Sequence, residues 1–127
     1  MRAAALAAIL LLSGCMAQTC NRLGGTPMVE YQLFFGRSNV SDEAWAKFAA
    51  QVITPGLPSG FTELDAQGQW MHPETHQISR ERSRLVIVAV PDTPVTQSAI
   101  AQIKDEYRQW FAQIVVGTVV HPVCAAF

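Results

Sequence analysis

Charge is scarce in this sequence, and no long apolar run follows the first 14 residues. Charged residues make up 15% of the 127, nine Lys or Arg against ten Asp or Glu, while 50% are hydrophobic. A nucleic-acid interface needs clustered Lys and Arg, so we expect no nucleic-acid partner. Spanning a bilayer as a helix takes roughly 20 apolar residues, and the chain after residue 14 has no such run. The composition instead predicts one globular domain with a packed core.

Motifs for catalysis and cofactor binding are also missing. No serine stands in a nucleophile-elbow context, and Gly24-Gly25 lies in a tether-like segment, not in a phosphate-binding loop. The three cysteines form no Cys-x-x-Cys pair, and Pro73 between His72 and His76 argues against a helical zinc site. We therefore expect no catalytic residue, no bound metal and no cofactor.

The N-terminus has the pattern of an export signal. Arg2 supplies a positive charge, and the apolar run Ala3–Leu12 is too short to span a membrane but typical of a secretory signal peptide. The next residues, Leu12-Ser13-Gly14-Cys15, resemble the lipobox of bacterial lipoproteins. The resemblance implies cleavage before Cys15 and lipid attachment to it, with two or three acyl chains as the membrane anchor. The alternative is an ordinary signal peptide cut near Ala17.

Lipidation of Cys15 would leave Cys20 and Cys124 as an even pair of cysteines in an oxidising compartment. We expect a disulfide between them, with two free thiols or a metal pair as the alternatives. In the resembling class an Asp after the lipidated cysteine favours the inner membrane. Met16 stands there, which favours the periplasmic face of an outer membrane. The chain then divides into a leader at 1–14, a lipidated tether at 15–28 and a globular domain at 29–127.

Alternating and helical patterns predict six elements in the domain. Strands are expected at about 30–36, 61–71, 80–90 and 116–127, where apolar residues alternate or run without a break. Ser41 and Thr93 are suited to cap two amphipathic helices, the first ending at Pro55 and the second reaching about Ile114. The β-α-β-β-α-β order predicts a ferredoxin-like α+β fold, with a four-stranded antiparallel sheet and both helices on one face.

The sheet face opposite the helices is the predicted binding face. With Leu64 and Trp70 turned to the helices, the second strand would place a polar row on this face, beside a third strand that is apolar on both sides. Exposed apolar surface of this kind is typical of a partner or ligand site. The arginines of the set could hold an anion or pair with acids across strands. The set comprises Arg37, Glu63, Asp65, Gln67, Gln69, Arg80 and Arg82.

Five short segments share their order and spacing with a known family. They are Leu33–Arg37, Ser41–Trp45, Gly68–Trp70, Arg80–Ser83 and Pro122–Cys124. Together they resemble the small bacterial secreted proteins and lipoproteins of domain of unknown function 3574, over about residues 20–127. The family has no established activity, so the resemblance implies an envelope location and domain boundaries, and no chemistry.

These features predict a lipid-anchored cell-envelope protein, without catalytic activity, that binds a partner through the open sheet face. The partner would be a second copy of the chain, as in a homodimer, or another envelope protein. The alternative is a small-molecule-binding domain or enzyme with a cavity at a homodimer interface. A buried polar pocket holding Glu63, Gln67, Gln69 and Arg82 would favour that alternative, whereas a flat, partly apolar patch would favour protein binding.

Overall fold

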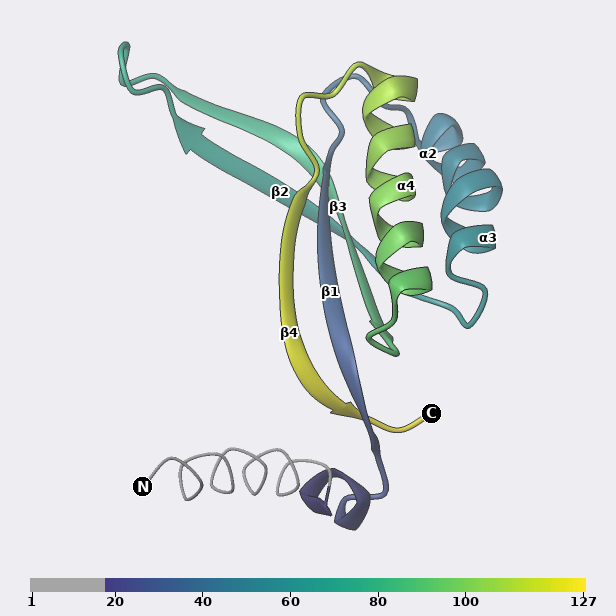
Figure 1. Cartoon of the computed structure of the whole chain (residues 1–127). Coiled ribbons are helices and arrows are strands. Elements are labelled where there is room, and N and C mark those ends of the chain that lie inside the picture. Colours follow the sequence, from purple (N-terminus) through teal and green to yellow (C-terminus); the bar gives the residue numbers. More distant parts are fainter. Residues whose placement is uncertain (1–17) are drawn as a thin grey trace, which may run out of the picture.

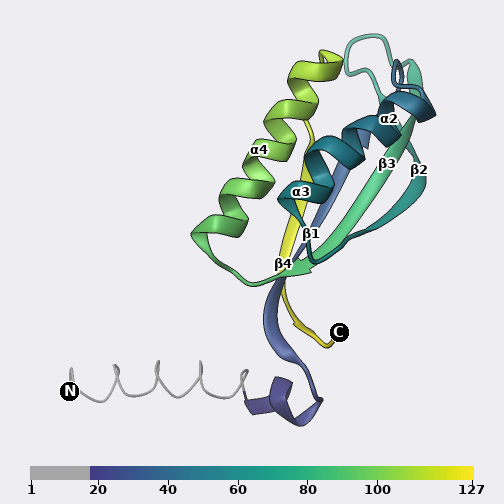
Figure 2. The same cartoon turned by 90° about the vertical axis from the view of Figure 1, so that its right-hand side faces the viewer.

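The computed structural model describes residues 18–127, so the predicted leader and Cys15 lie outside the described residues. The strands are β1 (Thr26–Gly36), β2 (Thr62–Met71), β3 (Ile78–Val90) and β4 (Gly117–Ala125). They form one antiparallel sheet in the order β2-β3-β1-β4. The helices between β1 and β4 all cover the same face of this sheet (Figures 1 and 2). The predicted ferredoxin-like α+β fold is confirmed, with β1 and β3 as the central strands.

Both predicted helices begin at the predicted caps. Ser41 accepts a hydrogen bond from a backbone N–H at the start of α2 (Asp42–Phe48), and Thr93 does the same for α4 (Pro94–Phe111). The first helix continues through a π-helical turn, η1 (Ala49–Ile53), into α3 (Thr54–Gly56). The prediction that this helix ends at Pro55 is therefore wrong by one residue. Pro55 follows the π-helical turn closely, and the helix ends one residue after it.

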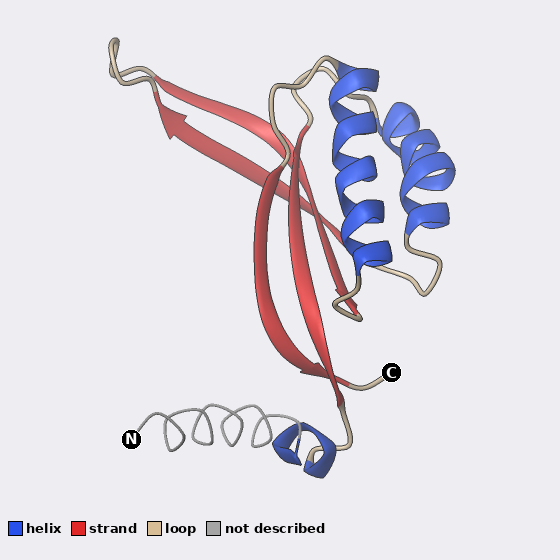
Figure 3. Cartoon of the chain, viewed as in Figure 1, coloured by secondary structure: helices blue, strands red, loops and turns tan. Residues whose placement is uncertain are grey.

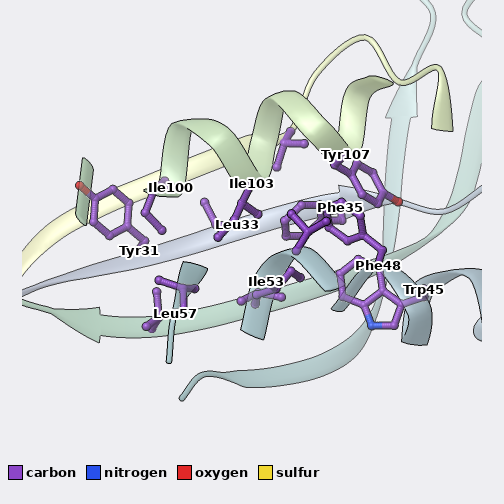
Figure 4. Close-up of a cluster of buried hydrophobic side chains, with 14 of the residues drawn as sticks. Tyr31, Leu33, Phe35, Trp45, Phe48, Ile53, Leu57, Ile100, Ile103 and Tyr107 are labelled. Carbon is purple, nitrogen blue, oxygen red and sulfur yellow. The ribbon is translucent and has the colours of Figure 1, made fainter. Parts of the chain in front are cut away.

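The hydrophobic core lies between the helices and the sheet. Figure 4 shows Leu33 and Phe35 of β1 pointing at the helices, where both side chains are fully buried. The ring of Phe35 packs edge-on against Trp45 and Tyr107, with centroid distances of 5.2 and 4.7 Å. The Tyr107 hydroxyl donates a 2.7 Å hydrogen bond to the Gly36 carbonyl, and burial raises the pKa of Tyr107 to about 12. These contacts hold α4 and α2 on one side of β1, and in Figure 3 no described helix lies on the other side of the sheet.

The β2–β3 hairpin extends past the helices, as Figures 1 and 3 show. β1 ends at Gly36, opposite Ser83, so the outer part of the hairpin, Gly68–Glu81, is a ribbon of two strands only. Such a ribbon is marginally stable in water without further packing. The ribbon also carries large apolar side chains that remain exposed to solvent: Trp70 is 45% exposed, and Met71 and Ile78 are each more than half exposed.

A disulfide closes the opposite end of the sheet. Cys20 lies in a helical turn at residues 18–22 and is bonded to Cys124 of β4, with 5.4 Å between the Cα atoms. Gly25 makes this packing possible, because a Cβ at this position would lie 2.8 Å from the Cys124 Sγ. β1 begins at Thr26, earlier than expected, and pairs there with β4 alone. Residues 18–25, expected to be part of a tether, are thus fixed to the end of the sheet.

Candidate functional site

An apolar row crosses the sheet face that has no helices. Leu64 of β2, Leu85 of β3 and Phe34 of β1 are direct neighbours in the strand register, and Gly117 of β4 comes next. Successive side chains of a strand alternate between faces, and Phe35 points into the core, so Phe34 points away from it. Phe34 also covers Gly117, where an added Cβ would lie 3.2 Å from the Phe34 Cβ. Phe34 is 37% exposed and Leu64 46% exposed.

A polar line lies beside this apolar row, on the β1–β4 side of the face. Glu30 and His121 are opposite each other in the register, with 3.4 Å between His121 Nε2 and Glu30 Oε1. Gln32 donates a 2.9 Å hydrogen bond to the same oxygen. The sequence alone does not identify Glu30 as the partner of His121, because the pairing depends on the β1–β4 register, which local patterns do not reveal. These polar groups satisfy one another within the chain and do not converge on a cavity.

The polar row of β2 lies on the other face of the sheet, so its predicted position is wrong. Glu63 accepts a 2.8 Å hydrogen bond from the Trp45 indole N–H, and Asp65 lies 3.6 Å from Arg37, both on the helix side. Alternation then places Leu64 and Trp70 on the open face. The expectation failed because β2 is an edge strand without a fully buried residue, so hydrophobicity does not decide which of its faces meets the helices.

Arg37 is a buried residue and not part of an exposed binding face. Its Nη2 lies 2.5 Å from Asp42 Oδ1 and 3.3 Å from the Val40 carbonyl. Its guanidinium carbon lies 5.8 Å from the centroid of the Trp45 ring, which allows a cation–π contact. Two of its nitrogens, Nε and Nη1, make no hydrogen bond to the described residues, although Nη1 faces Asp65. The predicted exposure of Arg37 is therefore wrong.

Arg84 completes an ion-pair network around Trp45. It lies 3.6 Å from Glu63 and 3.3 Å from Asp65, and its guanidinium carbon is 5.5 Å from the Trp45 ring centroid. Arg37, Arg82 and Arg84 thus bring three guanidinium groups to three carboxylates. These carboxylates belong to Asp42, Glu63 and Asp65. The network is balanced in charge, so it favours the cross-strand pairing over the anion site. Sequence reasoning named Glu63 and Asp65 as pairing acids, but it did not predict that Asp42 joins them.

The remaining members of the predicted set lie along the outer hairpin. Arg80 donates a 2.6 Å hydrogen bond to Gln69, its partner in the register. Arg82 lies opposite Gln67 and reaches back to Asp42 at 2.9 Å. All of these side chains are exposed on the helix side of the ribbon, and no described cavity gathers them.

Asp42 couples this network to pH. Hydrogen bonds from Arg37, and then from Arg82, hold the pKa of Asp42 below its ordinary value of 3.8. A lowered pKa in the folded state stabilises the fold above pH 3.8, and this contribution is lost as the pH falls through the lower folded pKa. We expect wild type to exceed Asp42→Asn in free energy of unfolding at neutral pH, and the difference to shrink on acidification. Urea unfolding at a series of pH values measures it, and a difference independent of pH would contradict the coupling. The difference should be smaller in an Arg82→Gln background.

Among residues 18–127, no three His, Cys, Asp or Glu side chains are grouped so that they could hold a metal ion. At the hairpin tip, His72 Nε2 lies 2.8 Å from the Ser79 hydroxyl. No helix in this part of the chain combines the length and the apolar character needed to cross a membrane. The uncovered apolar row is a surface of the kind that typically binds a partner.

The fold and this face define the protein as a small ferredoxin-like domain with an exposed apolar sheet surface. The chain belongs to the family described as protein of unknown function (DUF3574), whose model matches residues 30–127. The predicted family is thus confirmed, and its description names no activity. No curated protein matches the chain.

Solved structures of several kinds share the fold. A phage SAM lyase in complex with S-methyl-5'-thioadenosine has a TM-score of 0.55 at 16% identity, covering 77% of this chain and 90% of that one. CutA1 from Oryza sativa has a TM-score of 0.53 at 11% identity, covering 81% and 85%. A B. subtilis GlnK–ATP complex has a TM-score of 0.50 at 10% identity, covering 76% and 82%. At such identities the likeness concerns the fold and carries over no ligand or activity.

Proposed function

We propose that this protein is a lipid-anchored component of the bacterial cell envelope whose domain binds a second copy of itself through the open sheet face. One observation carries the proposal, the apolar row of Leu64, Leu85 and Phe34 on a face that no described element covers. Contiguous apolar surface of this kind on a soluble domain marks an interaction site. Its burial against another copy would remove Phe34 and Leu64 from water.

Two further features favour a second copy as the partner. Among residues 18–127 no further strand pairs with the outer hairpin, and its exposed Trp70 supplies an aromatic group of the kind enriched at interface centres. Strand β4 lies at a sheet edge and exposes Val119 and Val120, an apolar edge that monomeric proteins usually protect with charge. A copy that covers the face, the ribbon and this edge could reach the 1,200–2,000 Å² or so of a specific interface.

The electrostatics of the face are compatible with this partner. Glu30 already pairs with His121, and Glu81 accepts a hydrogen bond from Ser38. Burial of the face therefore leaves neither carboxylate without a partner, which would be costly. An open surface whose polar groups pair with one another suits protein binding better than small-ligand capture.

The envelope location rests on the sequence and is supported by the cysteine pair. The lipobox-like residues before Cys15 are those at which a lipid would be attached. A disulfide such as Cys20–Cys124 is a feature of oxidising compartments outside the cytoplasm. We propose lipid attachment at Cys15 and, from Met16, sorting to the periplasmic face of the outer membrane.

The oligomeric mass tests the binding proposal. We expect residues 18–127, which contain every core residue and both disulfide cysteines, to run as an oligomer in light scattering after export to an oxidising compartment. Phe34→Glu should weaken association about 30-fold or more, the equivalent of a hot spot of about 2 kcal/mol. Ile114→Glu is the matched control, because Ile114 is 92% exposed and lies outside the face. A wild-type monomer at high concentration would refute self-association.

A further inference from the structure

The disulfide end of the domain forms a second exposed apolar surface. We call residues 18–28 and 122–127 the stem end. Leu23 is 74% exposed and Phe127 is fully exposed, and a hollow of about 310 Å³ beside Leu23 is lined by Pro27, Pro122, Val123 and the disulfide. Arg22 is the one charged side chain within these two ranges. Its exposed side chains thus include large apolar groups and one basic group, with no acidic side chain.

The stem end lies at one end of the sheet, where Phe127 also lines a hollow of about 410 Å³ with Thr62 of β2 and Ile87 of β3. In Figures 1 and 2 the start of β1 and the end of β4 project away from the helices and from the hairpin tip. In this region β1 pairs only with β4, and the pair Pro27–Cys124 lies next to the disulfide. The side chains of the open face that form the apolar row lie further up the sheet, at Phe34 and its neighbours.

The length of chain before the disulfide limits how far the stem end can lie from a lipid at Cys15. Cys15 and Cys20 are five peptide steps apart in the sequence. Even a fully extended chain covers at most about 3.6 Å per residue, or about 18 Å in this segment. Cys20 is covalently bonded to Cys124, so the end of β4 is held within the same short reach.

We propose that the stem end rests on the lipid bilayer, with Leu23 and Phe127 at the boundary between headgroups and acyl chains. The inference rests on the lipid anchor at Cys15 proposed above. Apolar side chains gain free energy at this boundary, and Arg22 meets anionic headgroups there. The contact would hold the sheet upright on the membrane and leave its open face accessible to a second copy anchored in the same bilayer.

The test uses the mature lipoprotein in vesicles of phosphatidylethanolamine and phosphatidylglycerol, with and without bromine on the acyl chains. Leu23→Trp and Phe127→Trp place a reporter at the stem end, and Ile114→Trp is the control far from it. After subtraction of wild-type emission, we expect the two stem-end reporters to be shifted to the blue and quenched by the brominated lipid. The emission of the control should show neither effect.

Incorporation of labelled palmitate, lost in Cys15→Ala, separates this inference from the proposed function. A labelled protein whose stem-end reporters stay unquenched would overturn the membrane contact and leave the anchor intact. Blue-shifted but unquenched reporters would mean that protein, such as a second copy, covers the stem end, which also overturns it. An absence of label would overturn the anchor and the membrane contact together, while self-association through the sheet face would still be decided by the mass measurement.

Discussion

Replacing Phe35 by alanine is expected to lower the free energy of unfolding by about 3–5 kcal/mol, as for other buried phenylalanines. The side chain is fully buried and packs against Trp45, Phe48 and Tyr107, so its loss leaves a cavity that three rings border. Urea unfolding followed by tryptophan fluorescence measures the change.

The neighbouring Phe34 is a control of the same residue type on the opposite face. Because it is partly exposed, Phe34→Ala should cost only about 1 kcal/mol of monomer stability. Its main effect should be on association. Equal losses of stability in the two variants, measured at concentrations where the protein is monomeric, would mean that the two faces of β1 are wrongly assigned.

The double variant Cys20→Ser and Cys124→Ser is expected to lose about 2–5 kcal/mol of stability. The bond joins residues 104 apart, and closing a loop of about 100 residues in the unfolded chain corresponds to about 4.7 kcal/mol in the chain-entropy model. In the folded state it also keeps Cys20 buried against Gly25 and the end of β4. Denaturation in guanidinium chloride measures the loss.

Reductant provides the control for this prediction. Reduction of the wild type should lower its midpoint toward that of the double variant and leave the double variant unchanged. If reduction had no effect on the wild type, the bond would not contribute to stability, whatever its geometry.

The element order and the helix caps could be predicted from local patterns, because Ser41, Thr93 and the alternating strands act over a few residues. The disulfide was also predictable, as Cys20 and Cys124 are the even pair left when Cys15, in a segment that resembles a lipobox, is set aside. The end of the second helix was less accurate. Trp110 is 42% exposed and α4 stops at Phe111, although the apolar spacing continues to Ile114.

Which face of β2 meets the helices could not be predicted, and the predicted polar row was therefore placed on the wrong face of the sheet. Alternation separates Leu64 and Trp70 from Glu63 and Asp65, but it does not say which set meets the helices. That choice depends on Trp45, whose indole N–H needs the Glu63 carboxylate, and on the arginines that stack on its ring. A pattern based on hydrophobicity assigns Arg37 and Arg84 to the surface, whereas paired guanidinium groups can be buried.

The pairing of β1 with β4 has a consequence for how the protein is made. Of the four strands, the ribosome completes β1 first and β4 last, yet these two strands lie side by side. The disulfide likewise joins a cysteine near the start of the described chain to one near its end. A nascent chain can therefore neither complete the four-stranded sheet nor form the disulfide until nearly all of it has been synthesised. Long-range contacts of this kind slow folding, so the chain spends its synthesis incompletely folded. Such late folding suits the envelope location proposed above, which would require export of the chain across a membrane.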